Sequence, residues 1–345
     1  MTLEGKRIAI TGVTGFIGSN LARHLLKQGA VVTGGGRKLE RARELEESGA
    51  TLVRFDMDDV DNFATLCEGQ DMVLHVAAWM GGADNKAVAH NVEAPVALAM
   101  ACGEAGVQRL VMFSSVSAYG SPPSDRVTES TPLDETQADA YGRTKAIGER
   151  MVRQAAQEAG IELVIVRPAM VYGPGSPSWT IGMFKMIAGG TPSLFGKADG
   201  HAYPVYIDNL VDAVARIITA DVNGEAFHFA DTHMPWTQWF GYYATMSGQP
   251  LRRIPLFAAK ILAFAATKLP LGIPLTPARL GLYQRKLIYD TSKARDKLQW
   301  QPVIDIEQGM LRSEAWLREV GRLPRTADGT PLAEQVDPPA ATDPQ

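Results

Sequence analysis

The chain has 345 residues, of which 46% are hydrophobic and 21% charged, and its formal net charge at pH 7 is −4. This composition is typical of a folded globular protein and excludes a disordered or fibrous chain. Lysine and arginine are mixed with aspartate and glutamate, so we expect no nucleic acid partner. The histidines are scattered and Cys67 and Cys102 lie in unrelated segments, so we expect no metal and read both cysteines as small apolar residues.

Short β-rich segments alternate with helical patterns from the N-terminus, beginning with "KRIAIT", "SNLARHLLKQG" and "VVTGG". This alternation predicts an α/β protein with a Rossmann-type, doubly wound parallel sheet and a smaller, discontinuous substrate lobe. The segment "MTLEGKRIAITG" carries no secretory signal pattern, so we expect a cytoplasmic protein. The expected boundaries are a dinucleotide-binding domain over 1–168 and 203–230, a substrate lobe over 169–202 and 231–324, and a flexible tail over 325–345.

A glycine-rich loop follows the first predicted strand in "ITGVTGFIGSN". Gly12, Gly15 and Gly18 stand where a tight turn, a close approach to pyrophosphate and a helix–strand contact each require a residue without a side chain. The amides at the start of the next helix would face the phosphates. The loop therefore predicts a dinucleotide site, with an ordinary glycine-rich turn as the alternative.

The second predicted strand ends in "VVTGGGRK", without the acidic residue that usually binds the ribose 2′-hydroxyl of NAD. Arg37 can meet a 2′-phosphate with two hydrogen bonds, which favours NADP over NAD. The alternative is that Arg37 and Lys38 only begin a solvated helix.

The segment "DAYGRTKAIGE" places Tyr141 and Lys145 one helical turn apart. A nearby ammonium and a positively charged nicotinamide ring would favour the phenolate and bring the pKa of tyrosine, ordinarily about 10, toward the working range. Ser115, at the end of the strand "RLVMFSS", would hold the substrate oxygen beside the tyrosine. In isolation, each of these features is more often a surface pair or a strand-end hydroxyl, and their joint occurrence indicates a proton-transfer site.

The most apolar segment is "IPLFAAKILAFAATKLPLGIPL", residues 254–275. Lys260 and Lys268 interrupt it, and Pro270 and Pro274 end any helix, so it is too broken to span a bilayer. We expect a helix that covers the substrate lobe, with weak contact to a membrane surface as the alternative.

The sequence resembles the extended short-chain dehydrogenase/reductases, the NAD-dependent epimerase/dehydratase group. The pieces appear in order from residue 6 to about 320: "TGVTGFIG", "HVAA", Asn91, "SSVSAYG", "YGRTK", "VRPAMVYGPG", "VYIDNLVDA" and "DTSKARDKLQWQP". The closest likeness is to the 3β-hydroxysteroid dehydrogenase-like and dihydroflavonol reductase-like branches.

The resemblance implies a role for each matching residue. Tyr141 is the general acid/base, Lys145 holds the nicotinamide ribose, Ser115 orients the reacting oxygen, and Asn91 completes the catalytic set. The other expected cofactor contacts are Gly12, Thr14, Gly15, Phe16, Ile17, Gly18, Arg37, Asp56, Met57, Ala77, Ala78, Pro168, Ala169 and Val171. It also implies a homodimer.

The substrate is the least determined part of the interpretation. Family members that act on nucleotide sugars usually carry an arginine and an asparagine where this chain has Ala202 and Met170, and Ser115, Val116 and Ser117 replace the Thr-Asp-Glu of the sugar dehydratases. Apolar residues predict a hydrophobic substrate instead. The candidate pocket residues, which are equally core candidates, are Trp79, Met80, Ser117, Met170, Trp179 and Met183.

Together these features predict an NADP-dependent oxidoreductase, with NAD as the alternative cofactor, acting on a secondary alcohol or ketone of a mostly apolar small molecule. The enzymatic alternative is a nucleotide-sugar epimerase that uses tightly bound NAD⁺. A cofactor-sensing protein without chemistry is disfavoured, because such proteins typically lose the tyrosine or the lysine.

Overall fold

The computed structural model of the protein describes residues 3–81, 84–268 and 277–323. The chain divides into two compact units. Unit 1 comprises residues 1–171, 203–233 and 285–302, and unit 2 comprises 172–202, 234–284 and 303–345. The expected flexible tail, 325–345, lies outside the described residues.

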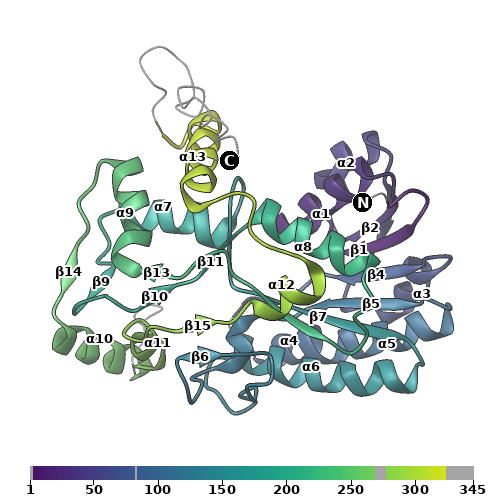
Figure 1. The fold of residues 1–345 in the computed structure, drawn as a ribbon, viewed down its shortest axis with the longest axis horizontal. Coiled ribbons are helices and arrows are strands. Elements are labelled where there is room, and N and C mark those ends of the chain that lie inside the picture. Colours follow the sequence, from purple (N-terminus) through teal and green to yellow (C-terminus); the bar gives the residue numbers. More distant parts are fainter. Residues whose placement is uncertain (1–2, 82–83, 269–276, 324–345) are drawn as a thin grey trace, which may run out of the picture. The chain divides into compact units, whose positions relative to one another are not determined.

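Unit 1 is built on a sheet of seven parallel strands in the order β12-β7-β5-β4-β1-β2-β3 (Figure 1). Strands β4 and β5 are buried along their whole length, as expected for parallel strands covered on both faces. The predicted Rossmann-type α/β fold is therefore confirmed. The strands of this sheet are β1 (Arg7–Thr11), β2 (Val31–Gly36), β3 (Thr51–Arg54), β4 (Met72–His75), β5 (Arg109–Phe113), β7 (Glu162–Pro168) and β12 (Ala226–Phe229).

Helices cover both faces of this sheet, with α1 beside α8 on one face and α5 beside α6 on the other (Figure 1). Helix α8 shows why: its apolar residues recur with the helical period and form one buried stripe that packs inward. The helices of unit 1 are α1 (Phe16–Lys27), α2 (Arg43–Glu47), α3 (Phe63–Cys67), α4 (Asp84–Val88), α5 (Ala94–Glu104), α6 (Ala140–Glu158), α8 (Ile207–Thr219) and α12 (Ser292–Leu298), with short turns at Leu39–Ala42, Val60–Asn62, Ala89–Glu93 and Val116–Tyr119.

The strand order reverses between β1 and β4, which pair in parallel with Thr11 opposite His75. At such a reversal the connections leave on opposite faces of the sheet and open a crevice at the carboxyl ends of the strands. This edge of the sheet is where the sequence places the glycine-rich loop and the segment after "LHVAA".

Residues 285–302 belong to unit 1, which corrects their expected place in the substrate lobe. Strand β15 (Ile288–Tyr289) pairs in parallel with β6 (Arg126–Val127), and the indole of Trp300 donates a hydrogen bond to the carbonyl of Asn209 at 3.0 Å. The sequence of residues 285–302 does not indicate that they pair with β6 and Asn209, which lie far away in the chain. Two further short strands, β8 (Met170–Tyr172) and β11 (Pro204–Tyr206), pair with each other.

Unit 2 has an aromatic core. Trp236, Trp239, Phe240 and Tyr243 of α9 are all buried. These side chains form the core of this unit. The elements of unit 2 are a π-helical turn (Pro177–Gly182), α7 (Met183–Ala188), α9 (Trp236–Ser247), α10 (Leu256–Lys268), α11 (Pro277–Leu282), α13 (Ile306–Glu319), β9 (Leu194–Phe195), β10 (His201–Ala202), β13 (Met234–Pro235) and β14 (Arg253–Ile254).

The two cysteines meet in the core of unit 1. Cys67 ends α3, Cys102 lies in α5, and their sulfur atoms are 3.7 Å apart as free thiols. Both are fully buried, as expected for small apolar residues. Their proximity could not be predicted, because it results from the packing of α3 against α5.

Candidate functional site

The glycine-rich loop joins β1 to α1 and needs its glycines for steric reasons. Gly12 has a φ of +71°, and a Cβ there would lie 3.1 Å from the backbone of Ala77, at the end of β4. A Cβ on Gly18 would lie 2.3 Å from the carbonyl oxygen of Gly12. The loop therefore turns in the left-handed region and packs tightly on its own helix.

This loop fits a dinucleotide pyrophosphate. Gly15 caps α1 with its backbone, no acidic residue lies in the first turn, and the first amides of a helix have no partner within it. Phe16 and Ile17 begin the helix and are half-buried, and Thr14 lies against the end of β2, where a Cβ on Gly36 would be 3.0 Å from its methyl group.

The expected adenine-side residues follow the ends of β2 and β3. Arg37 comes directly after β2 and is exposed. Asp56 and Met57 follow β3 and are half-buried; Asp56 accepts a hydrogen bond from the amide of Asp58, and Met57 packs on the apolar core. Strand order therefore places these residues along one edge of the sheet. Their expected contact with the cofactor remains a prediction.

The end of β4 is held by a threonine hydroxyl. Thr11 Oγ1 accepts hydrogen bonds from the amides of Val76 and Ala77, each at 3.1 Å, and lies 2.9 Å from His75 Nδ1. Burial, aided by Lys145, lowers the pKa of His75 to about 3, so the imidazole is neutral. Because Thr11 Oγ1 already accepts hydrogen bonds from two amides, its hydroxyl donates a hydrogen bond to Nδ1. Thr11, whose hydroxyl also contacts His75, therefore holds the backbone of Val76 and Ala77 directly after β4.

Asn91 is buried in the π-helical turn Ala89–Glu93, and its side chain forms hydrogen bonds with the backbone of Trp79. Its amide oxygen accepts from the Trp79 N–H at 2.8 Å, and its amide nitrogen donates to the Trp79 carbonyl at 2.9 Å and to Thr144 Oγ1 at 3.0 Å. These bonds tie the segment after β4 to α6. The side chain positions other residues, and its expected catalytic role remains a prediction.

The expected catalytic side chains converge near the end of β5. Asp139 caps α6 by accepting from the Gly142 amide at 2.9 Å, which places Tyr141 in the first turn of the helix. The Ser115 hydroxyl lies close enough to the Tyr141 phenol to lower its pKa. Lys145 lies one turn further, with Nζ 5.9 Å from the Tyr141 ring centroid and donating to the Phe113 carbonyl at 2.7 Å.

Burial dominates the acidity of these groups. It raises the pKa of Tyr141 to about 12, although the Ser115 hydroxyl lowers it, while Asp139 raises it further. Burial also lowers the pKa of Lys145 to about 8, against the opposing charge of Glu149. In the protein alone, loss of hydration penalises both charged forms and keeps the phenol protonated. The expected joint effect of Lys145 and a bound nicotinamide ring on the pKa of Tyr141 remains a prediction.

The carboxyl end of β7 brings three further expected residues to this edge. Pro168 ends β7 and is buried, Ala169 donates its amide to the Phe229 carbonyl at 3.0 Å, and Val171 is buried in β8. All three lie in unit 1. Their expected contact with nicotinamide remains a prediction.

A buried ion pair that sequence reasoning missed fastens α6 to β7. Glu149, one turn after Lys145, accepts from Arg167 Nε at 3.0 Å and from a second guanidinium nitrogen. Arg167 Nη1 also donates to the Tyr119 hydroxyl at 2.5 Å. Both members of the pair are at most 3% exposed, so each charge needs a partner. Arg153, which is partly exposed, also donates to Glu149 Oε1 at 3.2 Å.

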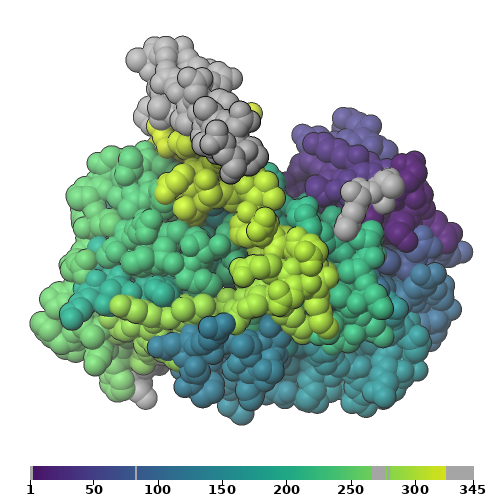
Figure 2. Space-filling model, viewed as in Figure 1, coloured from purple at the N-terminus to yellow at the C-terminus, as the bar shows by residue number. Residues whose placement is uncertain are grey.

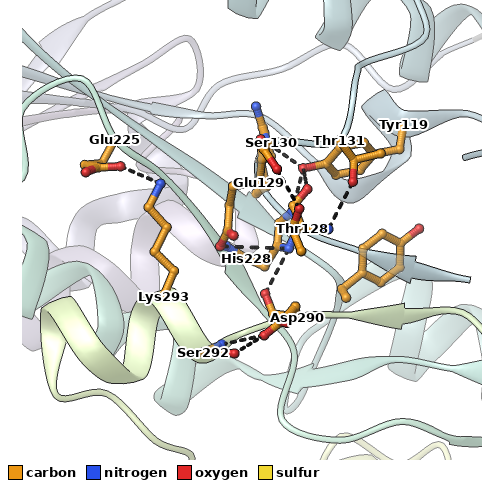
Figure 3. A network of polar contacts seen from close by, with 12 residues as sticks. Tyr119, Thr128, Glu129, Ser130, Thr131, Glu225, His228, Asp290, Ser292 and Lys293 are labelled. Carbon is orange, nitrogen blue, oxygen red and sulfur yellow. Dashed lines mark hydrogen bonds and ion pairs between the residues drawn. The ribbon is translucent and has the colours of Figure 1, made fainter. Parts of the chain in front are cut away.

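The network continues from Tyr119 to His228, which Figure 3 shows between Tyr119 and Asp290. His228 Nδ1 lies 3.1 Å from the Asp290 carbonyl and must donate, so its Nε2 accepts from Tyr119 at 2.6 Å. Burial lowers the pKa of His228 to about 3, in keeping with this neutral tautomer. The network links β7, β12, α6 and the turn after Ser115, and thereby holds the expected catalytic groups in place.

A charged residue at the end of the otherwise apolar strand "ELVIVRP", and a glutamate four residues after Lys145, are the signals that could have revealed Arg167 and Glu149. Neither signal names the partner. Pairing across 18 residues requires the strand and the helix to be packed.

Asp231 is another residue that sequence reasoning missed, and it is half-buried. Its Oδ2 accepts from the Tyr206 amide at 2.6 Å and from Asn209 Nδ2 at 2.9 Å, at the start of α8. Within the described part of the chain, Oδ1 is buried without a hydrogen-bond partner. Burial raises the pKa of Asp231 from 3.8 to about 7.

Asp231 should make stability depend on pH. The folded state keeps a proton that the unfolded state loses between about pH 4 and pH 7, so unfolding free energy should fall across that window, on the order of 3 kcal/mol. Asp231→Asn keeps an acceptor for both donors and should remove this slope. Urea denaturation of the wild type and of Asp231→Asn at pH 5 and pH 8 tests this prediction. If the two proteins differ in unfolding free energy by the same amount at both pH values, the assignment is contradicted.

The candidate pocket residues separate into two groups. Trp79, Met80, Ser117 and Met170 lie in unit 1, whereas Trp179 and Met183 lie in unit 2. Met80 is 68% exposed and Ser117 is exposed, but Met170 is buried at 2%. Their role in binding substrate remains a prediction.

The sequence matches the NAD dependent epimerase/dehydratase family over residues 8–230, which hold the glycine loop and the tyrosine–lysine pair. The chain belongs to this family. Its members are NAD-dependent enzymes, and the match confirms the resemblance to extended short-chain dehydrogenase/reductases.

Relatives in this family differ in chemistry. A 2-alkyl-3-oxoalkanoate reductase from Shewanella oneidensis is 26% identical over 335 residues, 89% of this chain and 85% of the relative. A UDP-glucose 4-epimerase from Mycolicibacterium smegmatis is 28% identical over 330 residues, 90% and 98% respectively. The fold is similar to that of UDP-glucuronic acid 4-epimerase from Bacillus cereus in complex with NAD, with a TM-score of 0.74, 22% identity and coverage of 91% and 97%.

Proposed function

We propose that the protein is an NADP-dependent oxidoreductase that transfers hydride between nicotinamide and a secondary alcohol or ketone of a mostly apolar small molecule. The position of the Tyr141 phenol close to the Ser115 hydroxyl, with Lys145 one helical turn away, carries the proposal. A phenol and a second hydroxyl that face each other can bind one substrate oxygen between them.

In the reducing direction, Tyr141 gives its proton to the carbonyl oxygen while Ser115 donates a hydrogen bond that holds the oxygen in place. The bound cofactor supplies hydride to the carbonyl carbon. Because burial holds the pKa of Tyr141 at about 12, the phenol is protonated at neutral pH and suited to this role. Lys145, tethered to the Phe113 carbonyl, would reach the nicotinamide ribose beside Tyr141.

An apolar substrate is supported by two positions and one relative. Ala202 and Met170 stand where nucleotide-sugar enzymes usually carry phosphate-binding side chains, and both are buried. The similarity to a 2-alkyl-3-oxoalkanoate reductase suggests an alkyl-bearing keto acid as a substrate class.

The second candidate is a nucleotide-sugar epimerase using tightly bound NAD⁺, favoured by the similarity to UDP-glucose 4-epimerase. The deciding experiment follows NADPH oxidation with a panel of 3-oxoalkanoates of increasing chain length, beside epimerisation assays and binding titrations with UDP- and dTDP-sugars. We expect turnover that improves with chain length and no saturable sugar-nucleotide binding. Micromolar binding of a UDP-sugar with epimerisation would favour the second candidate.

Arg37→Ala should change cofactor preference. Loss of a charge-assisted contact to a 2′-phosphate should weaken NADP binding roughly 10- to 100-fold and leave NAD binding almost unchanged. Titration of both cofactors by tryptophan fluorescence measures this, with Arg41→Ala, another exposed arginine of the same region, as the control. Equal losses for the two cofactors would remove the argument for NADP.

We also propose a homodimer in which α4 and α6 contribute to the interface, as the family resemblance implies. Sedimentation velocity of the full chain measures this, and a monomer at micromolar concentration contradicts it.

A further inference from the structure

Helix α10 of unit 2 buries small residues and exposes large apolar ones, the reverse of an ordinary amphipathic helix. Its buried face consists of Ala259 and Ala263, which pack against Leu280. Phe257, Ile261 and Phe264 are 69%, 65% and 63% exposed. A helix at the surface of a globular protein normally turns its large apolar side chains inward, so this arrangement indicates an external apolar partner.

These large side chains form a single stripe. Positions 257, 261 and 264 follow the i, i+4, i+7 spacing of one helix face, and Lys260, also exposed, lies on it. We call Phe257, Lys260, Ile261 and Phe264 the exposed face of α10. The segment that carries α10 lies at the surface in Figure 2.

The charged residues of the sequence segment that carries α10 all have one sign. The stretch 234–284 of unit 2 contains five lysines and arginines, Arg252, Arg253, Lys260, Lys268 and Arg279, and no aspartate or glutamate. Arg253 donates to the backbone carbonyls of Gly196 and Lys197, which leaves its charge available. An apolar stripe flanked by cations matches the chemistry of an anionic lipid surface.

We infer that the exposed face of α10 docks on the surface of an anionic phospholipid bilayer, with its three large apolar side chains among the acyl chains and its cations at the headgroups. No helix of the described residues is long and apolar enough to cross a membrane. A second copy of the chain is a poorer occupant, because a two-fold contact through this face would enclose two copies of Lys260, which carry the same charge, in one apolar interface. This inference does not depend on the proposed reaction.

Co-sedimentation of the full chain with lipid vesicles tests it. Vesicles of phosphatidylcholine that contain phosphatidylglycerol should bind the protein at least roughly tenfold more strongly than pure phosphatidylcholine, and added salt should weaken this binding. Equal binding to both vesicles, or no binding to either, overturns the inference.

Variants separate the stripe from general surface effects. Phe257→Ser/Ile261→Ser/Phe264→Ser should weaken binding roughly tenfold or more. The matched control is Val31→Ser/Val60→Ser/Val303→Ser, at positions 52%, 54% and 72% exposed, and should bind as the wild type does. Lys260→Glu, a single change at an exposed position, should also weaken binding to anionic vesicles, and it keeps the test decisive if the triple variant fails to fold.

The same variants distinguish a bilayer from a second copy. If the stripe is an interface between copies, the triple variant should convert a dimer to a monomer in sedimentation velocity, and neither vesicle should bind the wild type. That result, or unchanged vesicle binding by both α10 variants, overturns the inference.

Discussion

Tyr141→Phe should lower kcat roughly 100- to 10,000-fold and leave the dissociation constant of the cofactor almost unchanged. The substitution removes the hydroxyl that lies close to Ser115 and retains the ring next to Lys145. Because only the proton donor is lost, the effect should appear in turnover and not in cofactor affinity. Steady-state kinetics and cofactor titration on one preparation measure both quantities.

The control for this prediction is Tyr242→Phe, which removes a phenol that donates to Glu307 in unit 2 and should leave kcat unchanged. Tyr141→Phe with wild-type turnover would reject the assignment of the general acid/base. Equal loss of cofactor affinity and turnover would instead show that Tyr141 supports binding.

The pH dependence of the two directions adds an independent check. Burial holds the pKa of Tyr141 at about 12, so the phenol needed for reduction is present throughout pH 6 to 9. Oxidation needs the phenolate, whose fraction grows tenfold per pH unit below the pKa, so the oxidation rate should rise with pH. An oxidation rate that falls as pH rises contradicts Tyr141 as the base.

Arg167→Met should lower the free energy of unfolding by about 3–5 kcal/mol, the largest stability effect that we predict. The variant keeps the volume of the side chain but removes the buried guanidinium partner of Glu149, so that the buried carboxylate keeps only the partly exposed Arg153, whose Nη2 donates to it at 3.2 Å. It also removes the donor to the Tyr119 hydroxyl. Urea denaturation of the full chain measures the change.

Two comparisons isolate the buried charge as the cause. Arg150→Met breaks a pair with Glu135 that is largely exposed, at 57% and 35%, and should change stability little. Arg167→Met/Glu149→Leu removes both charges and should recover much of the loss. A double variant as unstable as Arg167→Met would mean that packing, not the unpaired charge, is responsible.

Local features of the sequence were sufficient for the glycine loop and for the geometry of Tyr141 and Lys145. The left-handed turn at Gly12 and the spacing of Tyr141 and Lys145 by one helical turn depend only on residues that are close in the sequence. They can therefore be predicted without knowledge of the tertiary structure. The alternation of strands and helices similarly determined the parallel sheet, because right-handed crossovers leave few arrangements.

The pKa values of Tyr141 and Lys145 could not be predicted from local features of the sequence. The sequence placed a lysine beside a tyrosine, but how far either group is removed from water depends on everything packed around it. In the structure this burial moves the two pKa values in opposite directions, each toward the neutral form.

Tertiary structure alone decided which distant segments meet. Residues 285–302 join unit 1 through a strand pair with β6, Glu149 finds Arg167, and α10 turns alanines inward and phenylalanines outward. In each case the deciding free energy comes from contacts between segments far apart in the chain, or from the burial of one face in place of another. A local pattern gives the propensity of a segment but does not name its partner, and only the packed fold supplies that partner.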